Sequence, residues 1–412
     1  MAEREVDFLI VGGGVAAGSC AKTLRGEGGK GSVLVVTRES DPPYSRPPLS
    51  KEYLAGKLPR EEAYHVPEDW YAENEVELLT RTSVMKLDPG ERIAKLSTRE
   101  DVSFRKALVA TGANVRRLRV DGGELDGIHY LRSFANSDAI RDELGEAERV
   151  VLVGGSYIGC EVAATLTSLG HRCSIVMQED VALERQFGPR VGGFFQSVLE
   201  EHGIEFHGGD ELDRYEGSAD RVERVLTKGG RSLDCRLVVV GAGVVPDVTL
   251  ARGAGLTIGD GGGVLCSDRL ETSAEGVYAA GDIAEYESAL HGRAARIEHW
   301  DVANEHGKTA ARNMAGGDVA HEAVPYFWSD LADWTGLEYV GAGTPSGEPA
   351  IRGSLDDGSF SAWGLADDGR VASVVAVGDH SGDLEHARRM IRERTKPDAA
   401  TLGDDGTDLA GL

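Results

Sequence analysis

The feature that most restricts the fold of this chain is a glycine-rich loop set directly between an apolar strand and a helix, and it occurs twice. In the first copy, apolar strands are predicted at residues 6–11 and 33–37, with the loop and the helix between them. The pattern G-x-G-x-x-A permits a tight turn, close approach of a pyrophosphate to the backbone, and close packing of helix on strand. The helix N-terminus then offers its free N–H groups to phosphates. A dinucleotide site is therefore predicted at Gly12, Gly13, Gly14, Val15, Ala16 and Ala17.

The second copy follows a strand predicted at residues 150–153, and a returning strand is predicted at 173–177. Here Ser156 stands where the middle glycine is expected, so its hydroxyl can face a phosphate but the closest backbone approach is lost. The alternative is a βαβ unit that binds nothing. An apolar helix face is expected from Ile158, Val162, Leu166 and Leu169. The second site is predicted at Gly155, Ser156, Tyr157, Ile158 and Gly159.

An acidic residue after the returning strand bears on the choice of nicotinamide. Glu179 lies 20 residues beyond Gly159, about where a ribose-binding carboxylate belongs. A carboxylate there accepts hydrogen bonds from ribose hydroxyls and repels a 2′-phosphate, which favours NADH. Arg185 is close enough to weaken that preference, so NADPH stays open.

Composition limits the partners of the chain. Its 412 residues suit two or three domains, and its net charge of −25 argues against nucleic acid, which requires a basic surface. No apolar run reaches the roughly 20 residues that span a bilayer, so no membrane span is expected. Acidic residues interrupt the apolar stretch within residues 1–11, which does not resemble a signal peptide, and a cytoplasmic location is predicted.

The spacing of the cysteines limits which redox chemistry the chain can perform by itself. Cys20, Cys160, Cys173, Cys235 and Cys266 are widely spread, without metal-ligand or redox-pair spacing. They are interpreted as buried, reduced thiols, and no metal site is predicted. A bound cofactor must then carry the electrons of any redox reaction. The two loops suggest a flavoprotein with FAD at one site and NAD(P)H at the other.

Five further motifs carry a resemblance to a known family. They are PYSRPPLSK at residues 43–51, ATG at 110–112, GAGVVP at 241–246, YAAGD at 278–282 and FWSD at 327–330. With them, the chain resembles the FAD-dependent pyridine nucleotide-disulfide oxidoreductase superfamily. It is most similar to the branch that holds the oxygenase-coupled ferredoxin reductases and the apoptosis-inducing factors.

The resemblance implies roles for individual residues. Lys51 would lie against the flavin and pair with Glu161, and these two are the implied catalytic residues. A cation at that edge stabilises a reduced, anionic ring, and a buried lysine needs a carboxylate partner. Asp282, expected just before a helix, would hold the ribityl chain. Glu39 is the candidate for the adenosine ribose, because Arg38 occupies the position of the family's usual acid.

Other residues match family positions around the cofactors. Those implied to contact FAD are Arg38, Arg46, Val84, Ala110, Thr111, Gly112, Arg132 and Gly281. Those implied around the isoalloxazine and the nicotinamide are Gly243, Glu298, His299, Trp300, Trp328 and Glu338. Plainer interpretations stay open: Lys51–Glu161 as a surface pair, His299 as an interior histidine, and Trp328 as part of a core.

The predicted fold class is α/β, with two Rossmann-like dinucleotide-binding domains of the three-layer ββα type plus a C-terminal α+β interface domain. The FAD-binding domain is predicted from residues 1–113 and 241–320, with the NAD(P)H-binding domain at 114–240 inserted. The interface domain is predicted at 321–396, with a final helix at 383–394 and Asp-Asp-Gly hairpin turns at 356–358 and 367–369. Residues 397–412 are expected to form a disordered tail.

Two functions follow from these expectations. In the first, hydride passes from NAD(P)H to FAD and electrons then pass singly to a ferredoxin or rubredoxin. The alternative is an NADH-sensing flavoprotein, like the apoptosis-inducing factors, whose reduced state alters dimerisation or partner binding. A monomer and a homodimer are both open, and a disulfide reductase is disfavoured because no cysteine lies near Ser45.

The acidity of the chain fits poorly with an acidic ferredoxin, since docking prefers opposite charges. A local basic patch is therefore expected at Arg116, Arg117 and Arg119, or at Arg293 and Arg296.

Overall fold

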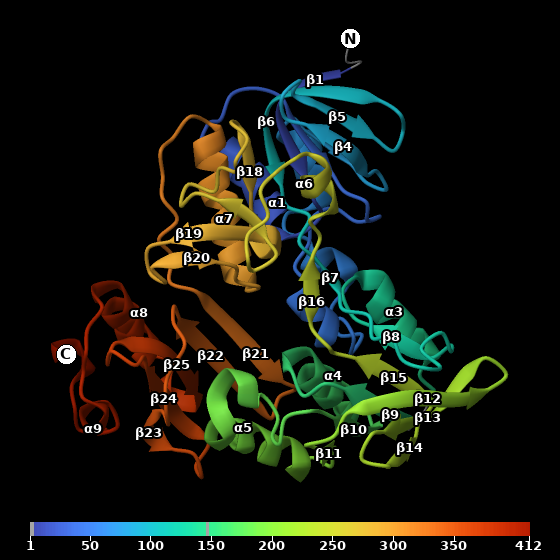
Figure 1. Cartoon of the computed structure of the whole chain (residues 1–412), viewed down its shortest axis with the longest axis vertical. Coiled ribbons are helices and arrows are strands. Elements are labelled where there is room, and N and C mark those ends of the chain that lie inside the picture. The colour runs from blue at the N-terminus through green and yellow to red at the C-terminus, as the bar shows by residue number, and fades with distance from the viewer. Residues whose placement is uncertain (1–3, 146–147) are drawn as a thin grey trace. The chain divides into compact units, whose positions relative to one another are not determined.

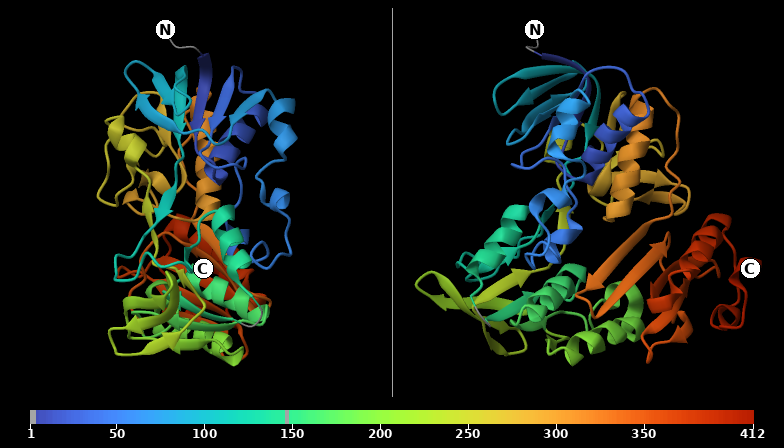
Figure 2. Two further views of the ribbon diagram at one scale, coloured as in Figure 1. Left: turned by 90° about the vertical axis from the view of Figure 1, so that its right-hand side faces the viewer. Right: turned by 180° about the vertical axis from the view of Figure 1, so that it is seen from behind.

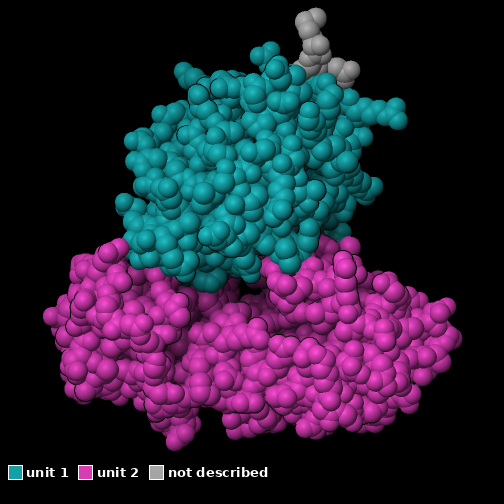
Figure 3. Space-filling model, viewed as in Figure 1, with its two compact units in different colours: residues 1–46, 60–114, 245–326 teal, residues 47–59, 115–244, 327–412 magenta. Residues whose placement is uncertain are grey.

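A computed structural model describes residues 4–145 and 148–412, which divide into two compact units (Figure 3). Unit 1 comprises the chain up to Arg46, Arg60–Asn114 and Val245–Tyr326, and unit 2 comprises Pro47–Pro59, Val115–Val244 and Phe327–Leu412. The short segment Pro47–Pro59, expected with the FAD-binding domain, belongs to unit 2. Across the described residues, no helix combines the length and the apolar character that crossing a membrane requires.

Unit 1 is built on a sheet with strand order β3-β2-β1-β6-β5-β4, in which β18 also pairs with β6 (Figure 1). The neighbours β3-β2-β1-β6 and β6-β18 pair in parallel, whereas β5 and β4 extend the sheet antiparallel. The strands are β1 (Arg4–Val11), β2 (Val33–Val36), β3 (Val76–Leu79), β4 (Val84–Asp88), β5 (Ile93–Leu96), β6 (Asp101–Val109) and β18 (Val277–Ala279). A smaller sheet joins β17 (Val264–Cys266), β19 (Ala284–Ser288) and β20 (Arg293–Ala295).

Two long helices of unit 1, α1 (Val15–Gly26) and α7 (Trp300–Met314), pack side by side against the sheet (Figures 1 and 2). The buried face of α1 includes Ala17, Cys20 and Ala21, whose small side chains permit close packing. Gly307 of α7 is in contact with α1, because a Cβ there would lie 2.4 Å from the carbonyl oxygen of Ala16. The shorter helices α2 (Glu68–Glu73) and α6 (Thr249–Gly253) complete the unit.

Unit 2 contains a parallel sheet with strand order β11-β10-β9-β15-β8. Its strands are β8 (Ile128–Tyr130), β9 (Arg149–Val153), β10 (Arg172–Val176), β11 (Glu205–His207) and β15 (Leu237–Val240). The helices are α3 (Phe134–Glu143), α4 (Tyr157–Ser168) and α5 (Glu184–Glu201). An antiparallel sheet is formed by β12 (Leu212–Ser218), β13 (Arg221–Thr227) and β14 (Ser232–Asp234). The chain leaves unit 1 in β7 (Ala113–Val115) and returns in β16 (Val244–Pro246), which pair with each other.

A third sheet of unit 2 is antiparallel and has the strand order β21-β22-β25-β24-β23. Its strands are β21 (Tyr326–Leu331), β22 (Thr335–Gly341), β23 (Ala350–Ser354), β24 (Ser359–Leu365) and β25 (Val371–Val377), and α8 (Asp383–Glu393) packs on it. Both Asp-Asp-Gly segments lie in the turns of the β23–β24 and β24–β25 hairpins, as predicted.

The expectation of a disordered tail is wrong. Residues beyond 396 include the short helix α9 (Ala399–Leu402) and a 3₁₀ turn, and they bury Leu402 and Leu409. The guanidinium of Arg352 donates hydrogen bonds to three backbone carbonyls of the tail, those of Asp404, Asp405 and Thr407. The aspartates and glycines of this segment form turns and caps around the two buried leucines.

Two local predictions also fail. Asp282 lies in a single 3₁₀ turn (Gly281–Ile283) followed by strand β19, not before a helix. The predicted apolar face of α4 is correct at Val162 and Leu166, which are fully buried, but Ile158 and Leu169 are 39% and 44% exposed. The helix buries its middle, and its apolar end residues reach the surface.

The register of each parallel sheet aligns the carboxyl ends of its strands. In unit 1, Val11 at the end of β1 is paired with both Val36 and Val109, and Val109 is also paired with Ala279. In unit 2, Val153, Val176, His207, Val240 and Tyr130 end their strands in the same way. Each sheet therefore gathers, at one edge, motifs that lie far apart in the sequence, and this edge is where open α/β sheets bind ligands.

Candidate functional site

The first glycine loop has the shape that a dinucleotide needs. Gly12 has φ +149°, and a Cβ there would lie 2.1 Å from the carbonyl oxygen of Ala110, so only glycine fits. A Cβ on Gly14 would meet nothing within 4 Å, which leaves open space in front of the loop. Helix α1 begins directly behind it, with no side-chain cap and no acidic residue in its first turn. Its terminal N–H groups are therefore available to a phosphate, and the residues fit the pyrophosphate of FAD.

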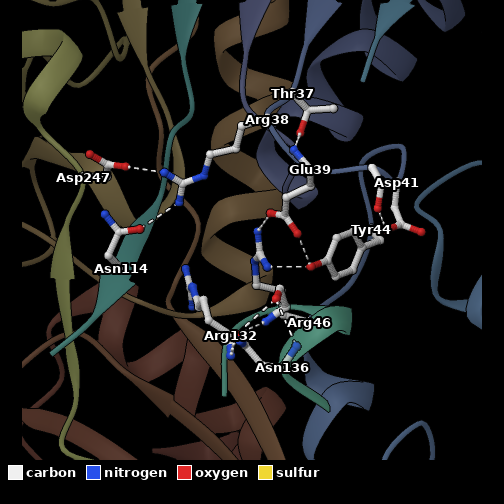
Figure 4. Close-up of polar contacts among 12 residues, drawn as sticks. Thr37, Arg38, Glu39, Asp41, Tyr44, Arg46, Asn114, Arg132, Asn136 and Asp247 are labelled. Carbon is white, nitrogen blue, oxygen red and sulfur yellow. Dashed lines mark hydrogen bonds and ion pairs between the residues drawn. The ribbon is translucent and has the colours of Figure 1, made fainter. Parts of the chain in front are cut away.

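Polar side chains follow the end of β2 (Figure 4). Arg46 Nη2 donates to Glu39 Oε1 at 2.7 Å, and the hydroxyl of Tyr44 donates to Glu39 Oε2 at 2.5 Å. Burial alone would raise the pKa of Glu39, but the adjacent Arg46 and the Tyr44 hydroxyl outweigh it and hold this pKa below its usual value. Glu39 is therefore a fixed, ionised acceptor at the edge that holds the glycine loop.

Arg38 points away from this group (Figure 4). Its guanidinium donates to Asp247 Oδ2 at 3.1 Å and to Asn114 Oδ1 at 2.8 Å. Arg38 thus binds Asn114 within β7 and Asp247 just after β16, and Glu39 alone takes the acidic position beside the loop.

The remaining predicted residues of unit 1 reach the same edge by different routes. Ala110, Thr111 and Gly112 follow β6, and the Thr111 hydroxyl donates to the carbonyl of Asp247 at 2.9 Å. Gly281 and Asp282 follow β18. Val84 begins β4, and the backbone N–H of Thr82 donates to the carbonyl of Thr37, which places this segment beside the end of β2.

Glu298, His299 and Trp300 lie at the start of α7. The indole N–H of Trp300 donates to the hydroxyl of Ser45 at 3.2 Å, and Glu298 pairs with Arg296 at 2.5 Å. Burial lowers the pKa of His299 to about 4, only partly opposed by Asp282, so the ring is neutral near pH 7. The plainer interpretation of His299 as an interior histidine fits this state.

The second glycine loop differs from the first in what its serine does. Ser156 is the N-cap of α4, yet its hydroxyl donates to the carbonyl of Gly241 at 3.0 Å and caps no N–H of the helix. The N–H groups at the start of α4 remain available, and its first turn has no acidic residue. Gly155, Tyr157, Ile158 and Gly159 complete this edge. These features fit a second dinucleotide, with Ser156 bracing the loop against the turn after β15.

Glu179 follows β10 at the same edge and forms an ion pair with Arg185 Nε. The side chain of Arg185 is 68% exposed, whereas that of Glu179 is 20% exposed. Tyr157 contacts the ring of Phe327, with centroids 4.9 Å apart. Gly243 has φ +86°, and its carbonyl accepts from the N–H of Arg116.

Lys51 is the centre of a buried charged cluster within unit 2. Its Nζ lies 3.6 Å from Glu161 Oε1 and 3.0 Å from Asp330 Oδ2, so the ion pair to Glu161 is joined by a hydrogen bond to Asp330. The hydroxyls of Ser50 and Ser329 donate to the two oxygens of Glu161 at 2.5 and 2.6 Å. The side chains of Lys51 and Glu161 are only 8% and 7% exposed, so the interpretation as a surface pair is wrong.

The buried carboxylate has an unusual protonation equilibrium. Burial raises the pKa of Glu161 above its usual value, although Lys51 and the two serine hydroxyls oppose the shift. Trp328 is part of the same cluster, since Lys51 Nζ lies 5.8 Å from the centre of its ring. Arg132 follows β8, with its backbone N–H bonded to Asn136, and Glu338 lies on β22. Both belong to unit 2.

Several contributing residues were not predicted. Ser50, Ser329 and Asp330 lie inside the motifs PPLSK and FWSD, next to residues that were singled out, so these motifs were the available signal. Tyr44 also lies in a recognised motif, but its bond to Glu39 requires a backbone path that only the fold reveals.

Comparison with known proteins agrees with this architecture. The family model described as pyridine nucleotide-disulphide oxidoreductase matches residues 6–307, and the model described as reductase C-terminal matches residues 326–412. The ferredoxin reductase subunit of the 5,5′-dehydrodivanillate O-demethylase from Sphingobium sp. (strain NBRC 103272 / SYK-6) is 33% identical over 98% of both chains. The rubredoxin-NAD(+) reductase of Ectopseudomonas oleovorans is 33% identical over 79% of this chain and 84% of its own. The reductase in the crystal structure of the covalent putidaredoxin reductase–putidaredoxin complex superposes with a TM-score of 0.92 at 32% identity, covering 100% of this chain and 98% of that one.

Proposed function

The chain belongs to the pyridine nucleotide-disulphide oxidoreductase family, and on this premise we propose that unit 1 holds FAD and unit 2 binds the nicotinamide dinucleotide. It is a flavoenzyme of the NAD(P)H-dependent ferredoxin reductase type. The assignment of the two sites depends on the register of the two parallel sheets. At one edge, each sheet brings together a glycine loop, an acidic residue and the turn that follows another strand, β6 in unit 1 and β15 in unit 2.

The residues of unit 1 divide the binding of FAD among them. The N–H groups of α1 and the space in front of Gly14 would take the pyrophosphate. Glu39 would accept from the adenosine ribose, because a carboxylate keeps acceptor capacity beyond its bonds to Arg46 and Tyr44. Asp282 would accept from the ribityl chain. When bound, FAD supplies the conversion between a two-electron donor and one-electron acceptors.

We propose that Lys51 stabilises the negative charge that develops when the flavin is reduced. Its ammonium is held by the carboxylates of Glu161 and Asp330, which compensate its charge in a buried position. Ser50 and Ser329 fix Glu161 from both sides, so the position of Lys51 is set before any ligand arrives. A fixed cation at the reacting edge would stabilise negative charge that develops there.

We also propose that NADH is the better donor. Glu179 would accept from the ribose hydroxyls and repel a 2′-phosphate. The Glu179→Ala variant removes that repulsion and releases Arg185, so the ratio of kcat/KM for NADPH to that for NADH should rise at least tenfold. The matched control is Glu201→Ala at the exposed end of α5, which should leave the ratio unchanged. An unchanged ratio in Glu179→Ala would exclude this residue as the determinant.

The proposed acceptor is a ferredoxin or a rubredoxin, in line with what the relatives' names state of them. The test is anaerobic titration of the flavin-loaded protein with NADH and NADPH, followed by stopped-flow reduction of a [2Fe–2S] ferredoxin and a rubredoxin. Rapid reduction of either carrier is expected. Slow reduction of every carrier, together with NADH-dependent dimerisation, would instead favour a redox sensor. A cytoplasmic location stays a prediction from the sequence.

A further inference from the structure

A buried histidine contacts the YAAGD motif, residues 278–282, of unit 1. His306, on α7, is 0% exposed, and its Nδ1 accepts a hydrogen bond from the backbone N–H of Gly281 at 3.3 Å. Gly281 comes immediately before Asp282, at the edge where β18 ends. None of the sequence motifs pointed to His306.

The hydrogen bond fixes the protonation state of the ring. Nδ1 can accept only when it carries no proton, so the imidazole must be neutral, with its proton on Nε2. Within the described part of the chain, Nε2 of His306 has no hydrogen-bond partner, and neither has Nε2 of the buried His321. The ring centroids of His306 and His321 are 4.4 Å apart, and the ring of Tyr286 lies 4.7 Å from His306.

The surroundings disfavour a positive charge on His306. Burial, and secondarily the neighbouring His321, holds the pKa of His306 well below its usual value, and burial lowers the pKa of His321 to about 4. The other titratable groups nearby are the Tyr286 hydroxyl, Asp282 next to Gly281, and Glu305, which partly opposes the shift of His321. Among the described residues of α7, the ion pairs join Lys308 to Glu305 and Arg312 to Glu27, and neither includes a histidine. Neutral His306 is therefore the form that this packing accepts.

Helix α7 contacts both the YAAGD motif and the first glycine loop at this point. A Cβ on Gly281, which has φ +78°, would lie 3.3 Å from the Cβ of Ala16 and 3.5 Å from that of Ala303. The neighbour of His306, Gly307, approaches the carbonyl of Ala16 in turn. A shift of Gly281 would thus disturb the first glycine loop as well as Asp282.

We propose that His306 is a positioning residue, which holds the Gly281–Asp282 turn in its cofactor-binding conformation only while its imidazole is neutral. Protonation would put an N–H on Nδ1 opposite the N–H of Gly281, so two donors would face each other and the hydrogen bond would be lost. This inference rests on the proposed function, in which the turn contacts FAD. A proton taken up by His306 when the turn is loose must be released when FAD binds.

This release of a proton should make the dissociation constant of FAD depend measurably on pH. Below the pKa that His306 has when the turn is loose and free of FAD, the dissociation constant of FAD should rise about tenfold per pH unit, because one proton is exchanged. The rise should stop where His306 is protonated in the bound state as well.

The experiment measures FAD dissociation between about pH 5 and pH 8 by the fluorescence of released FAD. In His306→Asn, Oδ1 can take the place of Nδ1 and does not titrate. The affinity for FAD near neutral pH should therefore stay within a few-fold of that of the wild type. The dissociation constant should depend on pH with one proton fewer than in the wild type. His306→Leu loses the acceptor, so it should bind FAD about tenfold more weakly than the wild type near neutral pH, and it should lack the pH dependence that His306 adds. His291→Asn is the matched control, because burial also lowers the pKa of His291 to about 4, while its Nδ1 bonds to Ser288.

A second readout needs no flavin. In ¹⁵N-labelled protein near neutral pH, the side-chain shifts of His306 should report the Nε2–H tautomer, and far-UV circular dichroism should show that each variant is folded. Identical pH slopes in wild type and His306→Asn would overturn the role of His306 alone, as would an Nδ1–H tautomer. Absence of FAD binding by the wild type at every pH would overturn the proposed function together with this inference.

Discussion

Lys51 interacts with two carboxylates that differ in their exposure to water. The side chain of Glu161 is 7% exposed and that of Asp330 is 45% exposed. Solvent can therefore compensate the charge of Asp330 after any substitution, but not that of Glu161. Glu161 depends on Lys51 and on the hydroxyls of Ser50 and Ser329, so the pair is sensitive to loss of either partner.

Replacement of Lys51 by methionine should lower the free energy of unfolding by about 3 kcal/mol, because it leaves a buried carboxylate without its cation. The pKa of Glu161 is already raised in the folded protein, so ionised Glu161 opposes folding and its cost appears as pH rises through the folded-state pKa. The loss in Lys51→Met should therefore be larger at about pH 8 than at about pH 5. Urea denaturation at both pH values measures it.

The double variant Lys51→Met/Glu161→Gln should recover most of this loss, since the unpaired charge is gone. Lys95→Met is the control, because its pair with Asp101 is exposed and should contribute less than about 1 kcal/mol. A Lys51→Met effect as small as that of Lys95→Met would show that Glu161 is not ionised in the fold.

At the scale of elements, what the sequence predicts well is local. The strand, loop and helix around Gly12 were predictable because hydrophobic period and glycine spacing act over a few residues. The turn at Asp282 was not: β19 forms there because Val264–Cys266 supplies a parallel partner, which no local pattern announces. Ile158 was misplaced for the same reason, since burial at a helix end is decided by neighbouring elements.

The candidate site, too, was predictable only in its local features. Lys51 and Glu161 could be paired through the resemblance, but Asp330 comes from a strand 279 residues further along. The bond from Arg38 to Asp247 spans 209 residues, and it explains why the acid of this edge is Glu39. Such long-range partners follow from strand order and register, and only the folded chain shows them.

The two outer glycines of the first G-x-G should respond differently to alanine. Gly12→Ala places a Cβ against a backbone carbonyl and should cost about 3 kcal/mol of stability. Gly14→Ala enters open space, so its effect on apo stability should stay within about 1 kcal/mol, yet FAD affinity should fall at least tenfold because the pyrophosphate needs that space. Chemical denaturation of the apo protein and FAD fluorescence separate the two effects. Equal FAD binding by Gly14→Ala and wild type would contradict this use of the loop.

The tail of unit 2 should behave as part of its sheet. Deletion of residues 397–412 removes the buried side chains of Leu402 and Leu409, each of which contributes about 2 kcal/mol. Thermal unfolding should therefore begin earlier, and proteases should cut the C-terminal sheet sooner. Asp398→Ala, which removes only the N-cap of α9, should cost about 1 kcal/mol and serves as the graded control. If the deletion did not change thermal unfolding, the tail would not contribute to the stability of unit 2.

At the scale of the whole molecule, the net charge of −25 opposes an acidic carrier. Arg116, Arg117 and Arg119 are all exposed on unit 2, whereas Arg296 is held by the carbonyls of Gly261 and Asp282 and by Glu298. The exposed trio therefore retains the role of candidate basic patch, whereas the alternative pair keeps only the exposed Arg293.

Changing these three arginines to glutamine should slow the reduction of an acidic ferredoxin several-fold at low ionic strength, because electrostatic steering is lost. The difference should vanish in high salt, where the Debye length is a few ångströms. Stopped-flow rates over a salt series measure it, with Arg81, Arg92 and Arg99 of unit 1 changed to glutamine as the control. Parallel salt dependences in the two triple variants would place docking elsewhere.

The way in which the chain alternates between its units has a consequence for its synthesis. The carboxyl half of β6 pairs with β18, whose residues leave the ribosome more than 160 positions after β6 has appeared. Until then, backbone N–H and C=O groups of β6 have no strand to pair with. Open sheet edges of this kind can associate with other chains. During translation this polypeptide should therefore pass through a long stage in which chaperones protect its first sheet.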